Sequence, residues 1–439
     1  MCKAVLLSRM SLLAILWLSL AACNSRKSPT VMVTETFPNQ MTETIPVRVT
    51  ETIPGLVTRT IPETATVETS VRVPVRWFIG LGTGGSTRQL AAAQAFAKQF
   101  NASQYRIELI VETVTGNSHD AVDQLLSEIK AGTAPDLAAP SGSWGMYQFP
   151  EYILPLDSLL ATIDLSDMDP KDLLYWQEGG KTIGFPLGVS PSFIFYKKNL
   201  FDKAGLPYPP HQFEEPYADG DPWTIDKMEA IAAQLTLDTD GKNARDADFD
   251  PGYVVQWGFH WQWDSTVSMA VMFGPGSVVG ENGTAIMPPH WREAFHWYYA
   301  GMWEKHFIPT ISQTSNMQGN PFTSGKIAMI NSFLWYAPRL TNLRDWDLAA
   351  APAYNGKITT RVERNGVSIL KTSAHPAEAF EVAVAIANSP ELLEAWGIVP
   401  AFKSLKPKMI AELKAQMPDV DWSRWPSARV QDELYAFLV

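Results

Sequence analysis

Residues 75–85 are Val-Arg-Trp-Phe-Ile-Gly-Leu-Gly-Thr-Gly-Gly, an apolar run that ends in a glycine-rich loop. Such a run is typical of a buried strand and the turn that follows it. Apolar residues then recur at helical spacing over 86–100, and residues 105–111 alternate as a second strand does. A helical pattern over 121–130 and a short strand over 136–139 follow. This β-α-β-α-β order predicts an α/β fold, with a parallel sheet and helices on both of its faces.

The loops after Gly80 and Ala139 fall at the carboxyl ends of the predicted strands, where ligands bind in sheets of this kind. The loop at 82–85 lacks the Lys-Ser/Thr pair of a P-loop and the acidic partner of a dinucleotide-binding GxGxxG. We therefore interpret it as a tight turn at a cleft edge, where a ligand approaches backbone N–H groups at a helix start.

The composition is that of a soluble globular protein, with 46% hydrophobic and 18% charged residues. Its 439 residues allow two or three domains, at roughly 100–200 residues each. The formal net charge is −11 and the sequence has no Lys/Arg block, which argues against a nucleic-acid partner.

Residues 1–22 have the pattern of a signal peptide. Two early basic residues precede an apolar stretch over 10–22, which is shorter than the about 20 residues that span a membrane. The stretch ends in Leu20-Ala21-Ala22-Cys23, which resembles a bacterial lipobox. The resemblance implies cleavage before Cys23 and lipidation of its thiol, with two or more acyl chains as a stable membrane anchor. An ordinary secretory signal with a chance cysteine is the alternative.

No metal site and no cofactor is predicted. Cys2 and Cys23 are the only cysteines of the chain, so cleavage and lipidation would leave no thiol for a disulfide, a metal or catalysis. In the acidic stretch 238–250, Lys242 and Asn243 occupy the fifth and sixth positions and Phe249 the twelfth. An EF-hand needs an oxygen ligand, Gly and Glu there. We interpret the stretch as a solvated acidic turn, and a looser Ca²⁺ loop stays open.

Residues 23–74 differ from the rest of the chain. After Cys23, a unit of the form Thr-Glu/Arg-Thr-Ile/Phe-Pro recurs every eight residues from Thr34 to Pro62. Regular prolines exclude a long helix and weaken any central strand. We interpret the segment as a semi-extended tether between anchor and domain, with a reach on the order of 150 Å. A small β-repeat arm is the alternative.

Seven later segments, taken together in their order and spacing, resemble the family 1 extracellular solute-binding proteins, which include maltose-binding protein. They are GTAPD at 132–136, GFPLG at 184–188, FYKKNLF at 195–201, AGLP at 204–207, PWTID at 222–226, FTSGKIAM at 322–329 and HPAEAF at 375–380. Three features depart from the family pattern: Lys197 stands where Asn is usual, Trp223 and Thr224 are in reverse order, and residues 207–222 form an insertion.

The resemblance implies a two-lobe periplasmic-binding-protein-like fold of type II, in which each lobe is a mostly parallel sheet flanked by helices. We assign residues 75–190 to lobe 1, 191–354 to lobe 2, 355–395 to a return into lobe 1, and 396–439 to helices that pack on lobe 2. Hinge strands are expected near 189–192 and 354–357.

The resemblance also implies the function: an extracytoplasmic lipoprotein that captures a carbohydrate or related small solute by hinge closure, delivers it to the permease of an ABC importer, and acts as a monomer without catalysis. Two other classes stay open. A secreted glycoside hydrolase needs two carboxylates about 5–9.5 Å apart, and the 46 acidic residues do not decide this. A non-catalytic surface scaffold is the third possibility.

Sugar rings present apolar faces and hydroxyl edges, so a sugar site combines flat aromatic rings with fixed polar groups. The resemblance places Trp335 in the cleft, after the GKIAM strand. Further candidates stand in loops after predicted strands or, more loosely, near them: Ser143, Trp144, Ser190, Trp261, Trp263, Asp264, Asn331 and Arg364. By contrast, Trp77, Trp257, Trp297 and Trp396 lie within strand or helix patterns, and we expect them to pack in the core.

Overall fold

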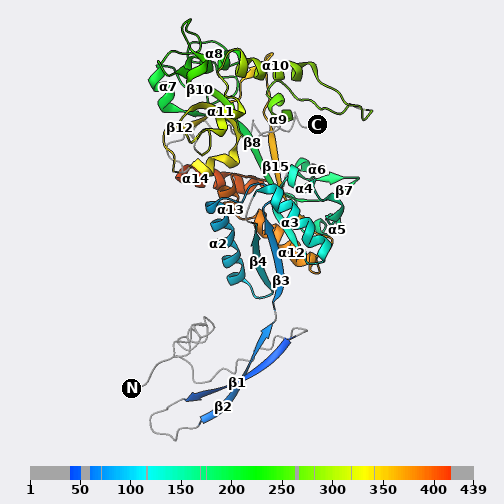
Figure 1. Ribbon diagram of the computed structural model, residues 1–439. Helices are drawn as coiled ribbons and strands as arrows, with labels where there is room; N and C mark the ends of the chain where they lie inside the picture. Colours follow the sequence, from blue (N-terminus) through cyan, green and yellow to red (C-terminus); the bar gives the residue numbers. More distant parts are fainter. Residues whose placement is uncertain are drawn as a thin grey trace. The chain divides into compact units, whose positions relative to one another are not determined.

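The computed structural model describes residues 40–50, 60–70, 72–114, 117–168, 170–174, 176–262, 266–280, 282–317, 319–340 and 342–416 (Figure 1). The chain divides into two compact units, Met1–Val71 and Arg72–Val439. In the first unit, β1 (Gln40–Thr50) pairs with β2 (Thr60–Ser70) as an antiparallel ribbon. A β-repeat arm of this kind was the alternative that the sequence analysis gave to an extended tether. The predicted signal peptide and Cys23 lie outside the described residues.

Lobe 1 is built around the predicted β-α-β-α-β unit. Its strands are β3 (Val73–Ile79), β4 (Ile107–Thr113) and β5 (Leu137–Gly142), and β3 is parallel to both of the others. Two helices connect them, α2 (Thr87–Ser103) and α3 (Ser118–Ala131). Each helix begins with a capping box, in which a side chain satisfies backbone N–H groups that have no partner within the helix.

Two antiparallel strands connect lobe 1 to lobe 2 (Figure 1). These hinge strands are β8 (Phe185–Lys197), whose 13 residues are all buried, and β15 (Val362–Ile369). They join the strands of both lobes into one sheet of order β4-β3-β5-β15-β8-β11-β10-β9. The first crossing lies in β8, where residues 189–192 were expected. The second lies in β15, a few residues after 354–357, because β13 (Ala353–Tyr354) and β14 (Lys357–Ile358) form a small hairpin before it.

Lobe 2 contains the parallel pair β10 (Val254–Trp261) and β11 (Ile327–Phe333), and β11 pairs antiparallel with the far half of β8. The edge strands are β9 (Leu237–Asp238) and β12 (Trp346–Ala349). Its helices are α7 (Lys198–Ala204), α8 (Ile225–Leu235), α9 (Thr266–Val271), α10 (Pro289–Trp303), α11 (Ile311–Ser315) and η4 (Leu334–Leu340). Gly258 lets α8 lie directly on β10, since a Cβ there would stand 1.9 Å from the carbonyl oxygen of Ala232.

The last described elements are α12 (Pro376–Ala387), α13 (Pro390–Trp396), β16 (Val399–Pro400), η5 (Lys403–Leu405) and α14 (Lys406–Gln416). Trp396 belongs to the core of lobe 1, whereas Met409 packs in a cluster with residues of lobe 2.

Short elements complete lobe 1: α4 (Ser143–Met146), η2 (Pro150–Tyr152), α5 (Asp157–Leu160), α6 (Pro170–Leu174), β6 (Gln177–Glu178) and β7 (Lys181–Thr182). In lobe 2, η3 (Pro251–Tyr253) precedes β10.

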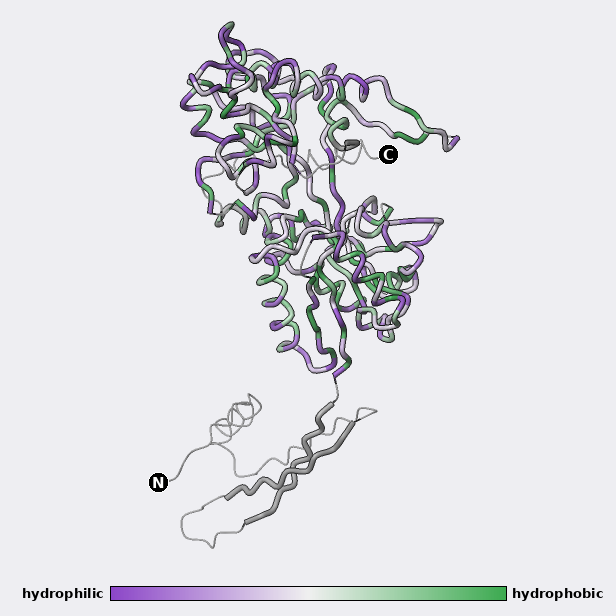
Figure 2. Tube along the Cα trace, viewed as in Figure 1, coloured by the Kyte–Doolittle hydropathy of each residue, from purple (hydrophilic) through white to green (hydrophobic). Residues whose placement is uncertain are grey.

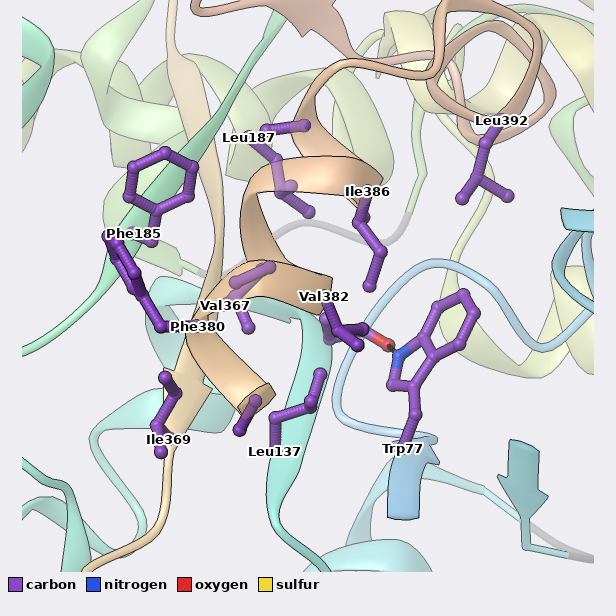
Figure 3. Close-up of a cluster of buried hydrophobic side chains, with 14 of the residues drawn as sticks. Trp77, Leu137, Phe185, Leu187, Val367, Ile369, Phe380, Val382, Ile386 and Leu392 are labelled. Carbon is purple, nitrogen blue, oxygen red and sulfur yellow. Dashed lines mark hydrogen bonds between the residues drawn. The ribbon is translucent and has the colours of Figure 1, made fainter. Parts of the chain in front are cut away.

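Each lobe has its own hydrophobic core. Figure 3 shows the core of lobe 1, a single cluster that contains Trp77 and side chains from β5, β8, β15 and α12. The indole N–H of Trp77 donates to the carbonyl of Ala139 at 2.7 Å. The tube in Figure 2 is largely hydrophobic along the inner strands of this lobe and hydrophilic along the outer loops of lobe 2. The four tryptophans expected in the core are all buried, namely Trp77, Trp257, Trp297 and Trp396. Within the described ranges, no helix combines the length and apolarity of a membrane span.

Candidate functional site

A cavity of about 520 Å³ opens where the two lobes meet at the hinge strands. Lobe 1 contributes the ends of β3 and β4 and the starts of α2 and α3; lobe 2 contributes Trp335 and Arg339 from η4; and β15 contributes Glu363. The cavity therefore lies at the carboxyl ends of the parallel strands of lobe 1, which is the edge where ligands bind in such sheets.

The glycine loop at 82–85 forms one wall of the cavity, and the side chain of Gln89 in α2 holds this loop by hydrogen bonds. Gln89, which is fully buried, accepts hydrogen bonds from the backbone N–H groups of Gly84 at 3.1 Å and Ser86 at 3.2 Å. Its amide nitrogen donates to the Thr83 hydroxyl at 2.8 Å. Among the described residues that line the cavity, lobe 1 supplies hydroxyl, amide and backbone groups but no ionisable side chain.

The opposite wall is formed by the indole of Trp335. Its Nε1 donates to Oε2 of Glu363 at 2.7 Å, and the ring is nearly parallel to that of Phe333, with 6.0 Å between centroids and 16° between planes. The guanidinium carbon of Arg339 lies 5.4 Å from the indole centroid, in cation–π geometry. Trp335 thus combines a flat apolar ring with neighbouring charged groups, as a sugar site requires.

The two ionisable groups of the cavity have opposite charge. Burial lowers the pKa of Arg339, but an arginine side chain stays protonated at neutral pH. Glu363 supplies the only carboxylate among the described lining residues. With one cation and one anion, the described lining residues carry no net charge, which favours an uncharged polar solute over an ionic one.

Three other predicted binding residues contact side chains or backbone groups of the protein that do not line the cavity. Ser190 is fully buried and donates to the carbonyl of Gly397 at 2.9 Å. Trp261 packs edge-on against Tyr298 with 5.1 Å between ring centroids, and the amide of Asn331 contacts the sulfur of Met272 at 3.6 Å.

The remaining candidates occupy different places. Trp144, in α4, is 41% exposed. Its ring centroid lies 4.9 Å from that of His119, which follows the cavity residues at the start of α3. Arg364 lies in β15 next to Glu363 and is partly buried. Ser143 begins α4. Trp263 and Asp264 lie outside the described residues. Of the predicted set, Trp335 alone is among the described residues lining the cavity.

Sequence reasoning missed Glu363, Arg339 and the buried support of Gln89. Glu363 directly precedes the predicted Arg364, and neighbouring strand residues face opposite sides of a sheet. A strand buried on both faces shows no alternation from which to choose between them. Arg339 stands only four residues after Trp335, in the same short helical segment, and this proximity in sequence was the available signal for that residue.

A second cavity of about 620 Å³ lies within lobe 2, between α7, α8 and the turn near Asn243. Although it is larger, it has residues from one lobe only, so lobe closure could not enclose a solute there. We therefore place the candidate site at the junction of the lobes.

The acidic stretch 238–250 forms a backbone-capped turn. The carboxylate of Asp238 accepts from the backbone N–H groups of Asp240, Lys242 and Asp250, each at 2.9 Å. These bonds, that from Asp250 first, hold the pKa of Asp238 below its ordinary value. The described residues include no cluster of three or more His, Cys, Asp or Glu side chains placed to hold a metal ion.

Residues 91–420 match the family model described as bacterial extracellular solute-binding protein. A comparison with curated protein sequences returned no match.

Solved structures share the fold at low sequence identity. An ABC substrate-binding protein from Listeria monocytogenes in complex with cycloalternan is 20% identical, with a TM-score of 0.62 over 84% of this chain and 94% of that chain. Maltose-bound MalE3 of T. maritima is 16% identical, with a TM-score of 0.59 over 79% and 85%. UgpB of Mycobacterium tuberculosis in complex with glycerophosphocholine is 14% identical, with a TM-score of 0.62 over 82% and 86%. The likeness identifies a two-lobe binding-protein fold.

Proposed function

Because the chain belongs to the bacterial extracellular solute-binding proteins, we propose that it captures an uncharged carbohydrate and delivers it to the membrane permease of an ABC importer. The observation that carries the proposal is the cavity of about 520 Å³ bounded by both lobes and by the hinge strand β15. Its size falls within the about 300–1,000 Å³ range of small-molecule sites. The indole of Trp335 supplies the stacking surface, and the hydroxyl and backbone groups of lobe 1 supply hydrogen bonds to the solute edge.

Binding proceeds by hinge closure. A solute that contacts lobe 1 and Trp335 at the same time gains interactions that exist only when the lobes are together, and this differential affinity shifts the population to the closed form. The closed form then docks on the permease. We also propose that the protein works as a monomer, with one solute bound by one chain.

Capture rather than catalysis is favoured by the distribution of carboxylates. Glycoside hydrolysis needs two carboxyl groups about 5–9.5 Å apart across the scissile bond. Glu363 is the single carboxylate among the described residues that line the cavity, and it already accepts a hydrogen bond from Trp335. We therefore propose that the solute leaves the site unaltered.

We propose that the amino-terminal segment keeps this activity on the extracytoplasmic side of a membrane, at the outer face of the cell or on the periplasmic side. Lipidation of Cys23 anchors the chain, and the repeat segment that follows holds the binding unit away from the lipid. A Cys23→Ala variant is expected to appear in the soluble extracytoplasmic fraction, whereas the unaltered chain is expected to sediment with membranes.

The test of the binding proposal is calorimetry of the mature protein against a library of neutral mono- and oligosaccharides, with uronic acids and glycerol phosphodiesters as charged comparators. We expect saturable binding of at least one neutral sugar and no comparable binding of its uronic acid. Preference for a charged comparator would contradict the assignment of an uncharged solute, and release of sugar monomers from an oligosaccharide would contradict capture without catalysis.

A further inference from the structure

We propose that Glu363 is a positioning residue, which holds the indole of Trp335 in its binding orientation and ties that ring to the hinge strands. The inference rests on the proposed function, because it concerns the ring that contacts the solute. Glu363 lines the cavity from β15, and its Oε2 accepts the indole N–H of Trp335 at 2.7 Å. Since Nε1 is the only polar atom of a tryptophan side chain, one hydrogen bond to a carboxylate fixes the rotation of the ring.

The second carboxylate oxygen of Glu363 lies against lobe 1. Gly142 ends β5, and a Cβ built on it would stand 2.8 Å from Glu363 Oε1. Gly142 does not have a positive φ, so its backbone conformation does not require glycine. The missing side chain instead leaves room for the Glu363 carboxylate. One oxygen of Glu363 thus faces the indole of lobe 2, and the other faces a strand end of lobe 1.

The backbone of Trp335 is held from the same hinge strands. Gly397, the C-cap of α13, has φ +66, and a Cβ on it would stand 2.4 Å from the Trp335 Cα. The carbonyl of Gly397 accepts the hydroxyl hydrogen bond of Ser190 at 2.9 Å. Because Ser190 and Glu363 are directly paired across β8 and β15, this pair contacts the indole of Trp335 through Glu363 and the glycine packed against the Trp335 backbone through Ser190.

A ring held in this way changes its position relative to lobe 1 whenever the hinge strands change their geometry. Glu363 thereby links solute contact to lobe closure, a role distinct from contacting the solute itself. Two consequences can be measured: the indole N–H should report on the Glu363 carboxylate without any solute, and the affinity for the solute should depend on the hydrogen-bond acceptor at residue 363.

The first measurement is the ¹⁵N–¹H spectrum of the protein labelled at tryptophan indole nitrogens, with no solute added. The Trp335 resonance is assigned by its loss in Trp335→Phe. We expect Glu363→Ala to move this resonance and accelerate its hydrogen exchange, Glu363→Gln to have a smaller effect because its amide oxygen still accepts, and Gly142→Ala to move it by displacing the carboxylate. Glu381→Gln, at an exposed residue of α12, is the control expected to leave the resonance unchanged. An unmoved Trp335 resonance in folded Glu363→Ala would overturn the positioning role.

The second measurement is affinity for the neutral sugar that calorimetry identifies. We expect about a tenfold loss in Glu363→Ala, the size of one hydrogen bond to a charged group, a partial rescue in Glu363→Gln, and a loss in Gly142→Ala. Equal affinities of Glu363→Ala and the unaltered protein would overturn the proposal. If the unaltered protein binds no carbohydrate, the proposed function fails, while the solute-free spectrum still decides whether Glu363 holds the ring.

Discussion

At the scale of single residues, the cavity wall depends on one aromatic ring and the groups around it. Trp335 was placed at the site through the family pattern around its GKIAM strand, because a tryptophan in a loop has no local signal that distinguishes solute contact from packing. Trp261 illustrates the difference, since it ends strand β10 near the cleft edge but its ring packs edge-on against Tyr298. Burial of this kind depends on helix α10, whose contacts no short stretch of sequence specifies.

The first prediction concerns the ring itself. Trp335→Ala should weaken solute binding by about 1–3 kcal/mol, the value of the apolar area that a stacked indole buries. Calorimetry with the identified sugar measures the loss. Trp303→Ala, which removes an indole that is 57% exposed on α10, is the matched control and should bind as the unaltered protein does. An unchanged affinity in folded Trp335→Ala would remove the ring from the site.

The second prediction concerns the pH dependence of stability. Burial lowers the pKa of His260 from an ordinary 6.5 to about 4, so the folded protein keeps this imidazole neutral. Between pH 6.5 and 4 the unfolded chain binds a proton at this imidazole that the folded protein does not bind. The stability that depends on a neutral His260 is therefore fully present above pH 6.5 and is lost as the pH falls towards 4. His260→Gln should reduce the loss between pH 7 and 4.5 by about 2 kcal/mol in urea denaturation. His296→Gln, at an exposed position of α10, is the matched control variant, and a loss in His260→Gln as large as that of the unaltered protein would contradict this role of His260.

At the scale of elements, the strands and helices of lobe 1 were predictable because the spacing of apolar residues changes clearly, from every second residue in the strands to a period of about 3.6 residues in the helices. α3 begins three residues before its periodic stretch because the capping box at Asn117 sets its start, whereas α2 begins directly after its N-cap Ser86, where the sequence predicted, and continues to Ser103. The second crossing was predicted too early, because nothing in the sequence separates the β13–β14 hairpin from the hinge strand after it. Its partners in β5 and β8 are more than 150 residues away in sequence.

The third prediction concerns the hinge strand β8. Gly188 has φ +147, and a Cβ there would stand 1.9 Å from the carbonyl oxygen of Val399 in β16. Gly188→Ala should cost about 2–4 kcal/mol of unfolding free energy, from the strained backbone and the displaced strand together. Gly85→Ala is the control, because a Cβ at Gly85 meets no atom within 4 Å. Equal denaturation midpoints of the two variants would contradict this packing.

At the scale of the whole binding unit, the fold class and the two-lobe arrangement could be predicted from the ordered family segments. The loop at 82–85 was also expected at a cleft edge, but Glu363 could not be predicted, since it meets Trp335 only after separate elements have packed. The fourth prediction is that the identified sugar reduces the radius of gyration of the mature protein in small-angle X-ray scattering, because closure brings the lobes together. A charged comparator that does not bind is the control, and unchanged scattering at saturating sugar would contradict hinge closure.

The course of β15 also bears on biosynthesis. The core of lobe 1 takes residues from Val75 as far as Phe402, so the ribosome must polymerise nearly the entire polypeptide before that core is complete. A domain whose native pairings join the two ends of its sequence nucleates slowly, because distant contacts carry a large loop-closure entropy. The nascent polypeptide thus stays unfolded in this domain during elongation, and an unfolded chain is what translocation through a narrow secretion channel requires.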